Sequence, residues 1–293
     1  MSETGTQVDL LTTPVTKLVD GFQFIEGPVW QSDDNCLIFN DIPGDTTFSW
    51  NETSGLAVLR RPSGKANGQV IDPLGRRVVC EHLTNAVARI TPDGEREVLA
   101  DRFGDHALNS PNDVIIGPDG SIIFTDPPFG RSEGAMGAIR PMELGFCGVF
   151  RWSAESGMQL LSTRLAEPNG LCLSLDRARL YVNDTATGEI IEFKTSWNTT
   201  SLVVDEGRVF ARVPDSPTGK ADGMKVDACG NIWCTGDVGI HVFDPDGEPL
   251  GVVAVDERVG NFAWGGVDGR DLYITASTSL YRSRTSVAGA DWV

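Results

Sequence analysis

NDVIIGPDGSIIFTD, residues 112–126, holds two short apolar stretches on either side of a Gly-Pro-Asp-Gly turn. Turn residues between two β-rich stretches are typical of a β-hairpin. The same pattern recurs five more times, each copy opening on Glu, Asp or Asn. The other copies are EGPVWQSDDNCLIFND (26–41), NGQVIDPLGRRVVCE (67–81), NGLCLSLDRARLYVND (169–184), DGMKVDACGNIWCTGD (222–237) and NFAWGGVDGRDLYITAS (261–277).

The openings of consecutive copies lie 39–57 residues apart. A period of about 40–50 residues with strand-turn-strand content is the signature of a β-propeller blade. Segments between the copies, such as AVARITPDGEREVLA (86–100), are again strand, turn and strand, and would supply the outer half of each blade. A pair of β-sandwiches is the alternative, but it does not explain a regular repeat. The sequence therefore predicts an all-β chain folded as a six-bladed β-propeller.

The repeats predict a single domain over residues 14–285, with a flexible tail at 1–13 and a short tail at 286–293. Residues near 14–20 should complete an outer strand of the last blade. No stretch keeps a 3.6-residue apolar period over three turns, so little helix is expected. The six cysteines form no CxxC pair and lie mostly in apolar stretches, which favours packed, reduced thiols over a metal site.

Composition limits the partners of this chain. Its 293 residues carry 24 Lys and Arg against 41 Asp and Glu, a formal net charge of −17. An acidic surface repels phosphate backbones and anionic lipid, so we expect neither nucleic-acid nor membrane partners. The N-terminus lacks the basic-then-apolar layout of a secretory signal, which favours a cytoplasmic location. A monomer or a small homo-oligomer fits these features.

The opening residue of every copy carries a carboxylate or an amide oxygen. Because the first strand of a propeller blade lines the central channel, these residues should form a ring around one end of it. They are Glu26, Asn67, Asn112, Asn169, Asp222 and Asn261. A hairpin returns to the end where it starts, so a second ring should lie just outside the first. Its members are Asp41, Glu81, Asp126, Asp184, Asp237 and Ser277.

Rings of hard oxygen ligands suit Ca²⁺, Mg²⁺ or Mn²⁺ and predict a central metal site. The alternative is that these residues cap strand ends and turns, as Asn and Asp often do. Two further features lie near the rings. His82 directly follows Glu81, which suggests a substrate contact. Residues 131–146 interrupt the third repeat, either as a plain surface insertion or as a mobile lid whose apolar side is Met136, Ile139, Met142 and Phe146.

Several phrases of the chain are similar to the SMP-30/gluconolactonase family, and to its bacterial gluconolactonase branch most of all. They are EGPVW, RPSGKANG, CEHLTNAVAR, LNSPNDV, FTDPPFG, EPNGL, ADGMKVD and HVFDPDG, and the resemblance runs from about residue 20 to residue 282. It implies a six-bladed propeller that opens sugar lactones at one divalent cation. It also implies that Glu26, Asn169 and Asp222 are metal ligands, with Asn112 on the metal or holding substrate. The animal branch has an Arg, which touches the sugar, at the position of Ser110.

The resulting hypothesis is a lactonase that depends on a divalent metal and acts on a gluconolactone-type sugar lactone or a related small lactone. Ca²⁺ is the first choice of cation, with Mg²⁺, Mn²⁺ or Zn²⁺ as alternatives. Asp222 is the candidate base, and Asn67, His82 and Asn261 would orient substrate hydroxyls. Ser110 and the 131–146 segment, including Glu143, would help to select the substrate. A calcium-dependent phosphotriesterase or other esterase, or a metal-binding propeller without catalysis, are the competing functions.

Overall fold

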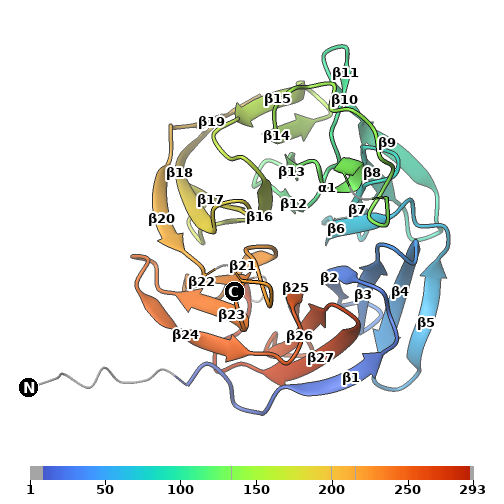
Figure 1. Cartoon of the computed structure of the whole chain (residues 1–293), viewed down its shortest axis with the longest axis vertical. Coiled ribbons are helices and arrows are strands. Elements are labelled where there is room, and N and C mark those ends of the chain that lie inside the picture. Colours follow the sequence, from blue (N-terminus) through green and yellow to red (C-terminus); the bar gives the residue numbers. More distant parts are fainter. Residues whose placement is uncertain (1–8, 133, 199, 215, 291–293) are drawn as a thin grey trace, which may run out of the picture.

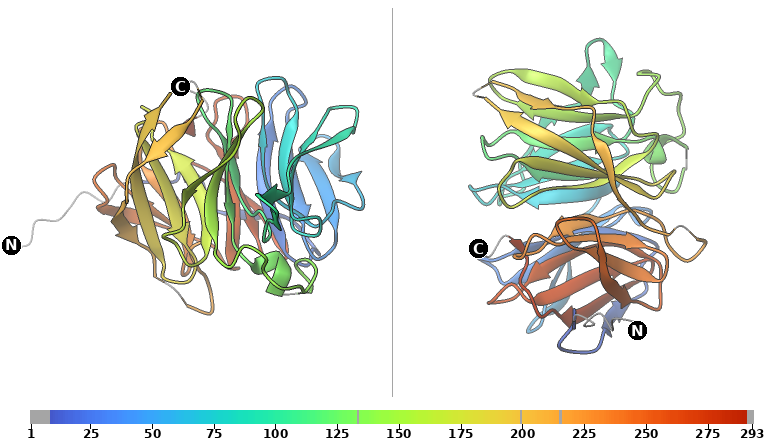
Figure 2. Two further views of the ribbon diagram at one scale, coloured as in Figure 1. Left: turned by 90° about the horizontal axis from the view of Figure 1, so that it is seen from above. Right: turned by 90° about the vertical axis from the view of Figure 1, so that its left-hand side faces the viewer.

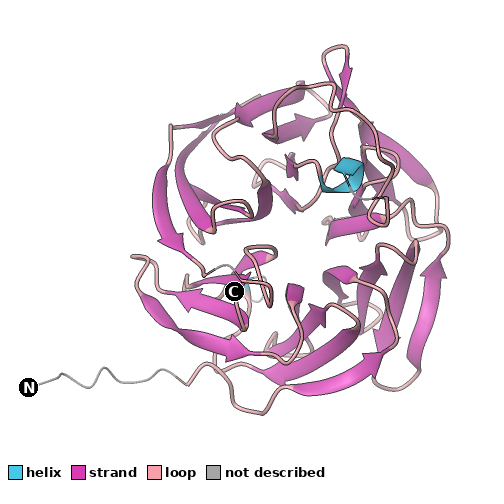
Figure 3. Cartoon of the chain, viewed as in Figure 1, coloured by secondary structure: helices cyan, strands magenta, loops and turns pink. Residues whose placement is uncertain are grey.

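Each predicted hairpin forms the inner half of a four-stranded antiparallel blade, and six blades surround a central channel (Figure 1). The computed structural model describes residues 9–132, 134–198, 200–214 and 216–290. This arrangement confirms the all-β, six-bladed propeller. Figure 3 shows how little of the chain is helical.

The strands of the first three blades follow one another along the chain. The first blade is β2 (Ile25–Gln31), β3 (Cys36–Asp41), β4 (Thr46–Asn51) and β5 (Gly55–Arg60). The second is β6 (Ala66–Ile71), β7 (Arg77–Glu81), β8 (Ala86–Ile90) and β9 (Arg96–Ala100). A small hairpin of β10 (Arg102–Phe103) and β11 (His106–Ala107) leads to the third, which is β12 (Val114–Ile116), β13 (Ile122–Asp126), β14 (Gly148–Ser153) and β15 (Gly157–Ser162).

The remaining blades complete the ring. The fourth is β16 (Pro168–Leu173), β17 (Arg179–Asp184), β18 (Glu189–Trp197) and β20 (Arg208–Arg212), with β19 (Leu202–Val204) also on β18. The fifth is β21 (Met224–Val226), β22 (Ile232–Gly236), β23 (Gly239–Phe243) and β24 (Pro249–Ala254). The sixth is β25 (Val259–Gly265), β26 (Asp271–Ala276), β27 (Ser279–Arg284) and β1 (Thr16–Asp20).

The last blade joins the two ends of the chain. β1 pairs antiparallel with β27, as in Lys17 opposite Tyr281, which confirms the prediction for residues near 14–20. Leu11 forms a further bridge with Thr285, and Leu10 and Leu11 pack on the apolar cluster of the fifth and sixth blades. The packed chain therefore begins before residue 14, and residues 1–8 of the predicted tail lie outside the described part.

The core lies between neighbouring blades. Val78 and Val87 of the second blade share one apolar cluster with Phe124 and Phe150 of the third. Trp233 of the fifth blade meets Trp264 of the sixth edge to face, with ring centroids 5.2 Å apart. Packing of this kind holds the inner strands at a defined spacing around the channel.

Cysteines take part in the same clusters. Cys80, Cys172 and Cys234 are buried and unpaired, and burial raises the pKa of the Cys172 thiol to about 12. These three thiols behave as small apolar side chains, as predicted.

One short helix, α1 (Phe129–Ser132), follows β13 and opens the segment that interrupts the third repeat. The helix and the loop after it lie on one face of the disc, and the described C-terminal end lies on the other (Figure 2). In the described ranges, no helix has the length and apolar character needed to span a bilayer.

Candidate active site

The six opening residues of the hairpins surround one end of the channel and are all buried. Glu26, Asn67, Asn169 and Asn261 lie near the start of inner strands, whereas Asn112 and Asp222 lie two residues before β12 and β21 begin. We call these six residues the oxygen ring.

Backbone hydrogen bonds join neighbouring members of the oxygen ring. The Gly68 N–H donates to Asn112 O at 2.8 Å, and the Gly170 N–H donates to Asp222 O at 3.0 Å. These bonds link the start of the second blade to that of the third, and the start of the fourth to that of the fifth, which fixes the spacing of these ring members.

Glycine allows the inner strands to approach this closely. A Cβ on Gly27 would lie 1.9 Å from Asn67 O, and one on Gly170 would lie 2.2 Å from Asp222 O. Both distances are impossible for a side chain, so the residue after Glu26 and after Asn169 must be glycine. The EG and NG pairs of the repeats are therefore a consequence of ring geometry.

Two carboxylates of the ring are electrostatically unfavourable as they stand. Glu26 Oε2 accepts the Gly27 N–H at 2.6 Å, while Oε1 is buried and has no partner among the described residues. Burial, followed by the charge of Asp222, raises the pKa of Glu26 well above its usual range. Burial raises the pKa of Asp222 to about 7, although Arg258 and Asn169 act in the opposite direction. A hard cation would relieve both effects.

His82 is buried beside the ring member Asn67, and the prediction that it contacts substrate directly stays a prediction. Its side chain is fully buried, with Nδ1 3.0 Å from Met136 O and Nε2 3.1 Å from Asn67 Nδ2. A carbonyl oxygen only accepts, so Nδ1 carries the proton and Nε2 accepts from the Asn67 amide. Asn67 therefore gives its N–H to His82, and its Oδ1 is free to face the channel. Burial lowers the pKa of His82 to about 4, which keeps this tautomer neutral at neutral pH.

Ser110 and Glu143 are occupied by loop contacts. The buried Ser110 hydroxyl donates to Pro127 O at 2.6 Å and accepts the Gly130 N–H at 3.0 Å. The hydroxyl thus already donates one hydrogen bond and accepts another within the protein, and a contact of Ser110 with substrate stays a prediction. The exposed Glu143 accepts the Ala107 N–H at 2.8 Å on β11.

The predicted second ring consists of caps and ion pairs, so the capping alternative applies to it. Asp41, Asp126 and Asp184 each accept backbone N–H groups from the loop that enters their own blade. Glu81 pairs with Arg60 and Arg96. Asp237 accepts from the Ser216 and Thr218 hydroxyls, and the Ser277 hydroxyl donates to Arg258 O. These groups are satisfied and offer a cation little.

The 131–146 segment is tied down by hydrogen bonds. Lys65 Nζ donates to Ala135 O at 2.7 Å, and the Arg140 guanidinium donates to His82 O at 3.1 Å. Ile139 is 76% exposed and Met142 is also exposed, so these apolar side chains do not close over the ring. A freely mobile apolar flap is thus not what the structure shows, and a role of the segment in substrate selection stays a prediction.

Two charged residues near the ring were not among the predicted site residues. Asp113 is buried, and its Oδ2 has no partner in the described part of the chain. Arg258 brings Nη2 to 3.7 Å from Asp222 Oδ2. A signal for Asp113 exists in the sequence: it follows Asn112 at the position where Glu26, Asn67, Asn169 and Asp222 are each followed by glycine. Arg258 lies in a loop and has no such signal.

The residues that carry this geometry match a known family. The SMP-30/gluconolactonase/LRE-like region corresponds to residues 24–278, which include the whole oxygen ring. This chain belongs to the SMP-30/gluconolactonase family. Within the family, it is 31% identical to a gluconolactonase of Zymomonas mobilis, over 95% of this chain and 83% of that protein. It is 27% identical to the pentonolactonase XacC of Haloferax volcanii, over 90% and 85% of the two chains.

Solved structures of the family have the same fold. A gluconolactonase from Xanthomonas campestris superimposes with a TM-score of 0.87 at 33% identity, over 94% of this chain and 91% of that one. The calcium-binding protein regucalcin from Agrobacterium tumefaciens superimposes with a TM-score of 0.76 at 17% identity, over 95% of each chain, which shows the shared fold alone.

Proposed function

We propose that this protein is a sugar lactonase that hydrolyses a small sugar lactone to the hydroxy acid. The observation that carries the proposal is the ring of buried amide and carboxylate oxygens at one channel end, in a chain whose family relatives include a gluconolactonase and a pentonolactonase. Amide and carboxylate groups around a channel mouth suit a polyhydroxylated ligand, because each can pair with a hydroxyl.

The same ring fits one divalent cation. Glu26, Asn169 and Asp222 would hold it, with Asn112 beside them, and Ca²⁺ matches this all-oxygen donor set best. The support from the structure is the orphaned Glu26 Oε1, together with the raised pKa values of Glu26 and Asp222. Bound there, a divalent cation supplies a Lewis acid for the lactone carbonyl.

The protein's own groups account for orientation and proton transfer. Asp222 would accept a proton from an attacking water, since it is a carboxylate on the ring beside the position of the lactone carbonyl. Asn67 and Asn261 would orient substrate hydroxyls, and His82 fixes which end of the Asn67 amide faces them. The Arg258 guanidinium beside Asp222 would favour the carboxylate that forms when the lactone opens.

The test is acid release from a panel of aldonolactones, aromatic lactones and phosphotriesters, each corrected for spontaneous hydrolysis. We expect turnover of aldonolactones, and loss of that turnover in Asp222→Asn. The matched control is Glu95→Gln, which removes a carboxylate from an exposed turn between β8 and β9 and should leave turnover unchanged.

A parallel set with chelator, followed by added Ca²⁺, Mg²⁺, Mn²⁺ or Zn²⁺, tests the cation separately. Turnover of phosphotriesters alone would replace the proposed substrate class, and absence of turnover on the whole panel would favour a propeller without catalysis. Full activity in chelator would refute the cation and leave the lactonase proposal standing.

A further inference from the structure

A cavity lies in the channel beyond the oxygen ring, toward the opposite end. The inner strands that start at the ring continue into its walls: β2 contributes Val29 and Trp30, and β16 contributes Leu171 and Cys172. The cavity has a volume of about 610 Å³, which is within the usual range for small-molecule sites. Strands rise about 3.3 Å per residue, and Leu171 is two residues beyond Asn169, so the near wall of this cavity is about 7 Å from the ring along the strand.

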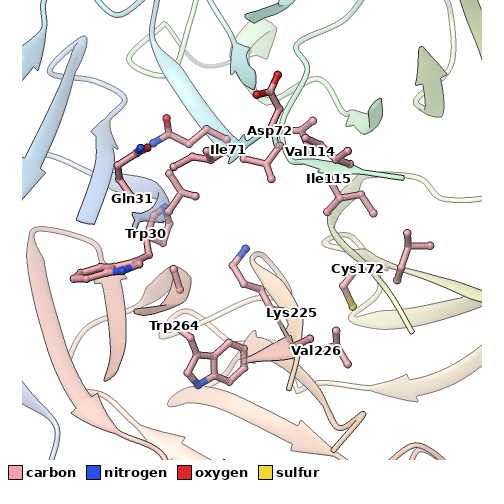
Figure 4. Close-up of a pocket in the computed structure, with 18 of the residues that line it drawn as sticks. Trp30, Gln31, Ile71, Asp72, Val114, Ile115, Cys172, Lys225, Val226 and Trp264 are labelled. Atoms are coloured by element: carbon pink, nitrogen blue, oxygen red, sulfur yellow. The ribbon is translucent and has the colours of Figure 1, made fainter. Parts of the chain in front are cut away.

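The walls of the far cavity combine half-buried apolar side chains with the polar side chains of Gln31, Gln69, Asp72 and Arg177. The Asp72 carboxylate is paired with Arg76 and Arg89. Val29, Trp30, Val70, Ile71 and Ile115 come from three blades and line one side. Trp264 of the sixth blade also lines the cavity and faces Ile71 and Ile115 in the close-up (Figure 4). Apolar side chains that remain open to water at the bottom of a cavity favour an apolar ligand.

Lys225 of β21 places a charge in the middle of this apolar surface. Its side chain points into the cavity in Figure 4, and it is half-buried. No hydrogen bond or ion pair of its ammonium group occurs with any residue that the structure describes. Its charge lowers the pKa of Asp113, which lies at the ring end of the channel and whose pKa burial raises. In a chain of net charge −17, with most of its cations paired, an unpaired ammonium group here is unusual.

We propose that the far cavity binds a small amphiphilic carboxylate, with its apolar body on Trp30, Val70 and Ile115 and its carboxylate on Lys225. An anion with an apolar body matches both features, because Lys225 alone would favour any anion and the walls alone any apolar molecule. The sugar acids expected at the oxygen ring do not match, since their hydroxyls would lose water against apolar walls. The site goes beyond the proposed lactonase activity and does not depend on it.

The experiment is calorimetric titration of the whole protein with octanoate, compared with octanol as the neutral probe of the same length. We expect saturable binding of octanoate and much weaker binding of octanol. Hexanoate should bind more weakly than octanoate, by about fourfold for each missing methylene group.

Variants locate the binding. Lys225→Met keeps the length of the side chain and removes the charge, and should weaken octanoate binding at least about tenfold. Lys225→Arg keeps the charge and should retain binding. Val70→Trp fills the cavity and should abolish binding while Lys225 is still present. Far-UV circular dichroism and melting temperature check that each variant is folded.

Glu26→Gln separates the two ends of the channel, because a carboxylate can also bind at a cation on the oxygen ring. Octanoate affinity should be unchanged in Glu26→Gln, and lactone turnover should persist in Lys225→Met. Equal affinity of wild type and Lys225→Met, no saturable binding by the wild type, or loss of binding in Glu26→Gln would each overturn the proposal. Failure of the lactonase proposal would instead appear as absent turnover with octanoate binding intact.

Discussion

The contact between His82 and Asn67 can be tested with two substitutions that each keep one half of the imidazole's function. In His82→Asn, the amide occupies the Nδ1 position and can still donate to Met136 O, but it does not reach Asn67. In His82→Gln, the side-chain oxygen can lie near the Nε2 position and accept from Asn67, while the donor to Met136 is lost. His82→Asn thus tests the orientation of the Asn67 amide, and His82→Gln tests the attachment of the 131–146 segment through Met136.

The expected magnitude follows from the lost hydrogen bond. A buried donor left without a partner costs about 1–3 kcal/mol, so the correct orientation of Asn67 should become less favourable by that amount. We expect kcat/KM on the best lactone to fall about 5–150-fold in His82→Asn and by much less in His82→Gln. Both variants should melt at a lower temperature, because each leaves one polar group unpaired.

Steady-state kinetics and thermal melts on the same preparations make the measurement. Asn67→Ala provides the matched background: adding His82→Asn to it should cause little further loss of kcat/KM, because the two residues act through one contact. Equal loss in His82→Asn and His82→Gln, or full additivity with Asn67→Ala, would refute the orientation argument. The lowered pKa of His82, about 4, also predicts how the stability of the protein changes with pH. A lowered pKa contributes stability above the unfolded value of about 6.5, and this stability should disappear as pH falls from 6.5 through 4.

Other predictions concern the oxygen ring and the segment beside it. Glu26→Gln should weaken Ca²⁺ binding, measured by calorimetry, by more than the loss of about 10–100-fold that is typical of outer-shell partners. In chelator the same variant should melt at a higher temperature, because it lacks a buried unpaired charge. Unchanged Ca²⁺ affinity would refute the role of Glu26 as a ligand. Asp222 has a raised pKa of about 7, so its ionisation should destabilise the cation-free protein as pH rises from about 4 through 7. For the same reason, Ca²⁺ affinity should fall as pH drops below 7. Stability and Ca²⁺ affinity that do not change with pH over this range would contradict the prediction. Gly170→Ala should cost about 1–3 kcal/mol and weaken Ca²⁺ binding, while Gly134→Ala, whose added Cβ meets only Ile139 at 3.7 Å, should do neither; equal melting temperatures would contradict the close approach. Replacing 131–146 by a few glycines should raise KM or change substrate preference with Ca²⁺ affinity nearly intact, and wild-type kcat/KM across the panel would end that idea.

The repeated hairpins could be predicted from sequence because their signals are local. Alternation of apolar stretches and turn residues within about fifteen positions specifies each hairpin, and six copies specify the propeller. The ring of Glu26, Asn112, Asn169 and Asp222 followed for the same reason, since equivalent positions in equivalent strands reach the same end of the channel.

The partners of the other polar side chains depend on contacts between segments far apart in the chain. Topology places Asp41 and Asp126 at the correct end of their blades, but only the packed loops show that backbone N–H groups occupy them. His82 is next to Glu81 in sequence, yet the position of Met136 turns it into a support for Asn67. Lys225 looks like an ordinary charge within a strand until six blades close around it. Period and residue type thus determined the architecture and the ring, whereas the direction of each buried polar side chain was decided by the partner that tertiary packing brought within hydrogen-bonding distance.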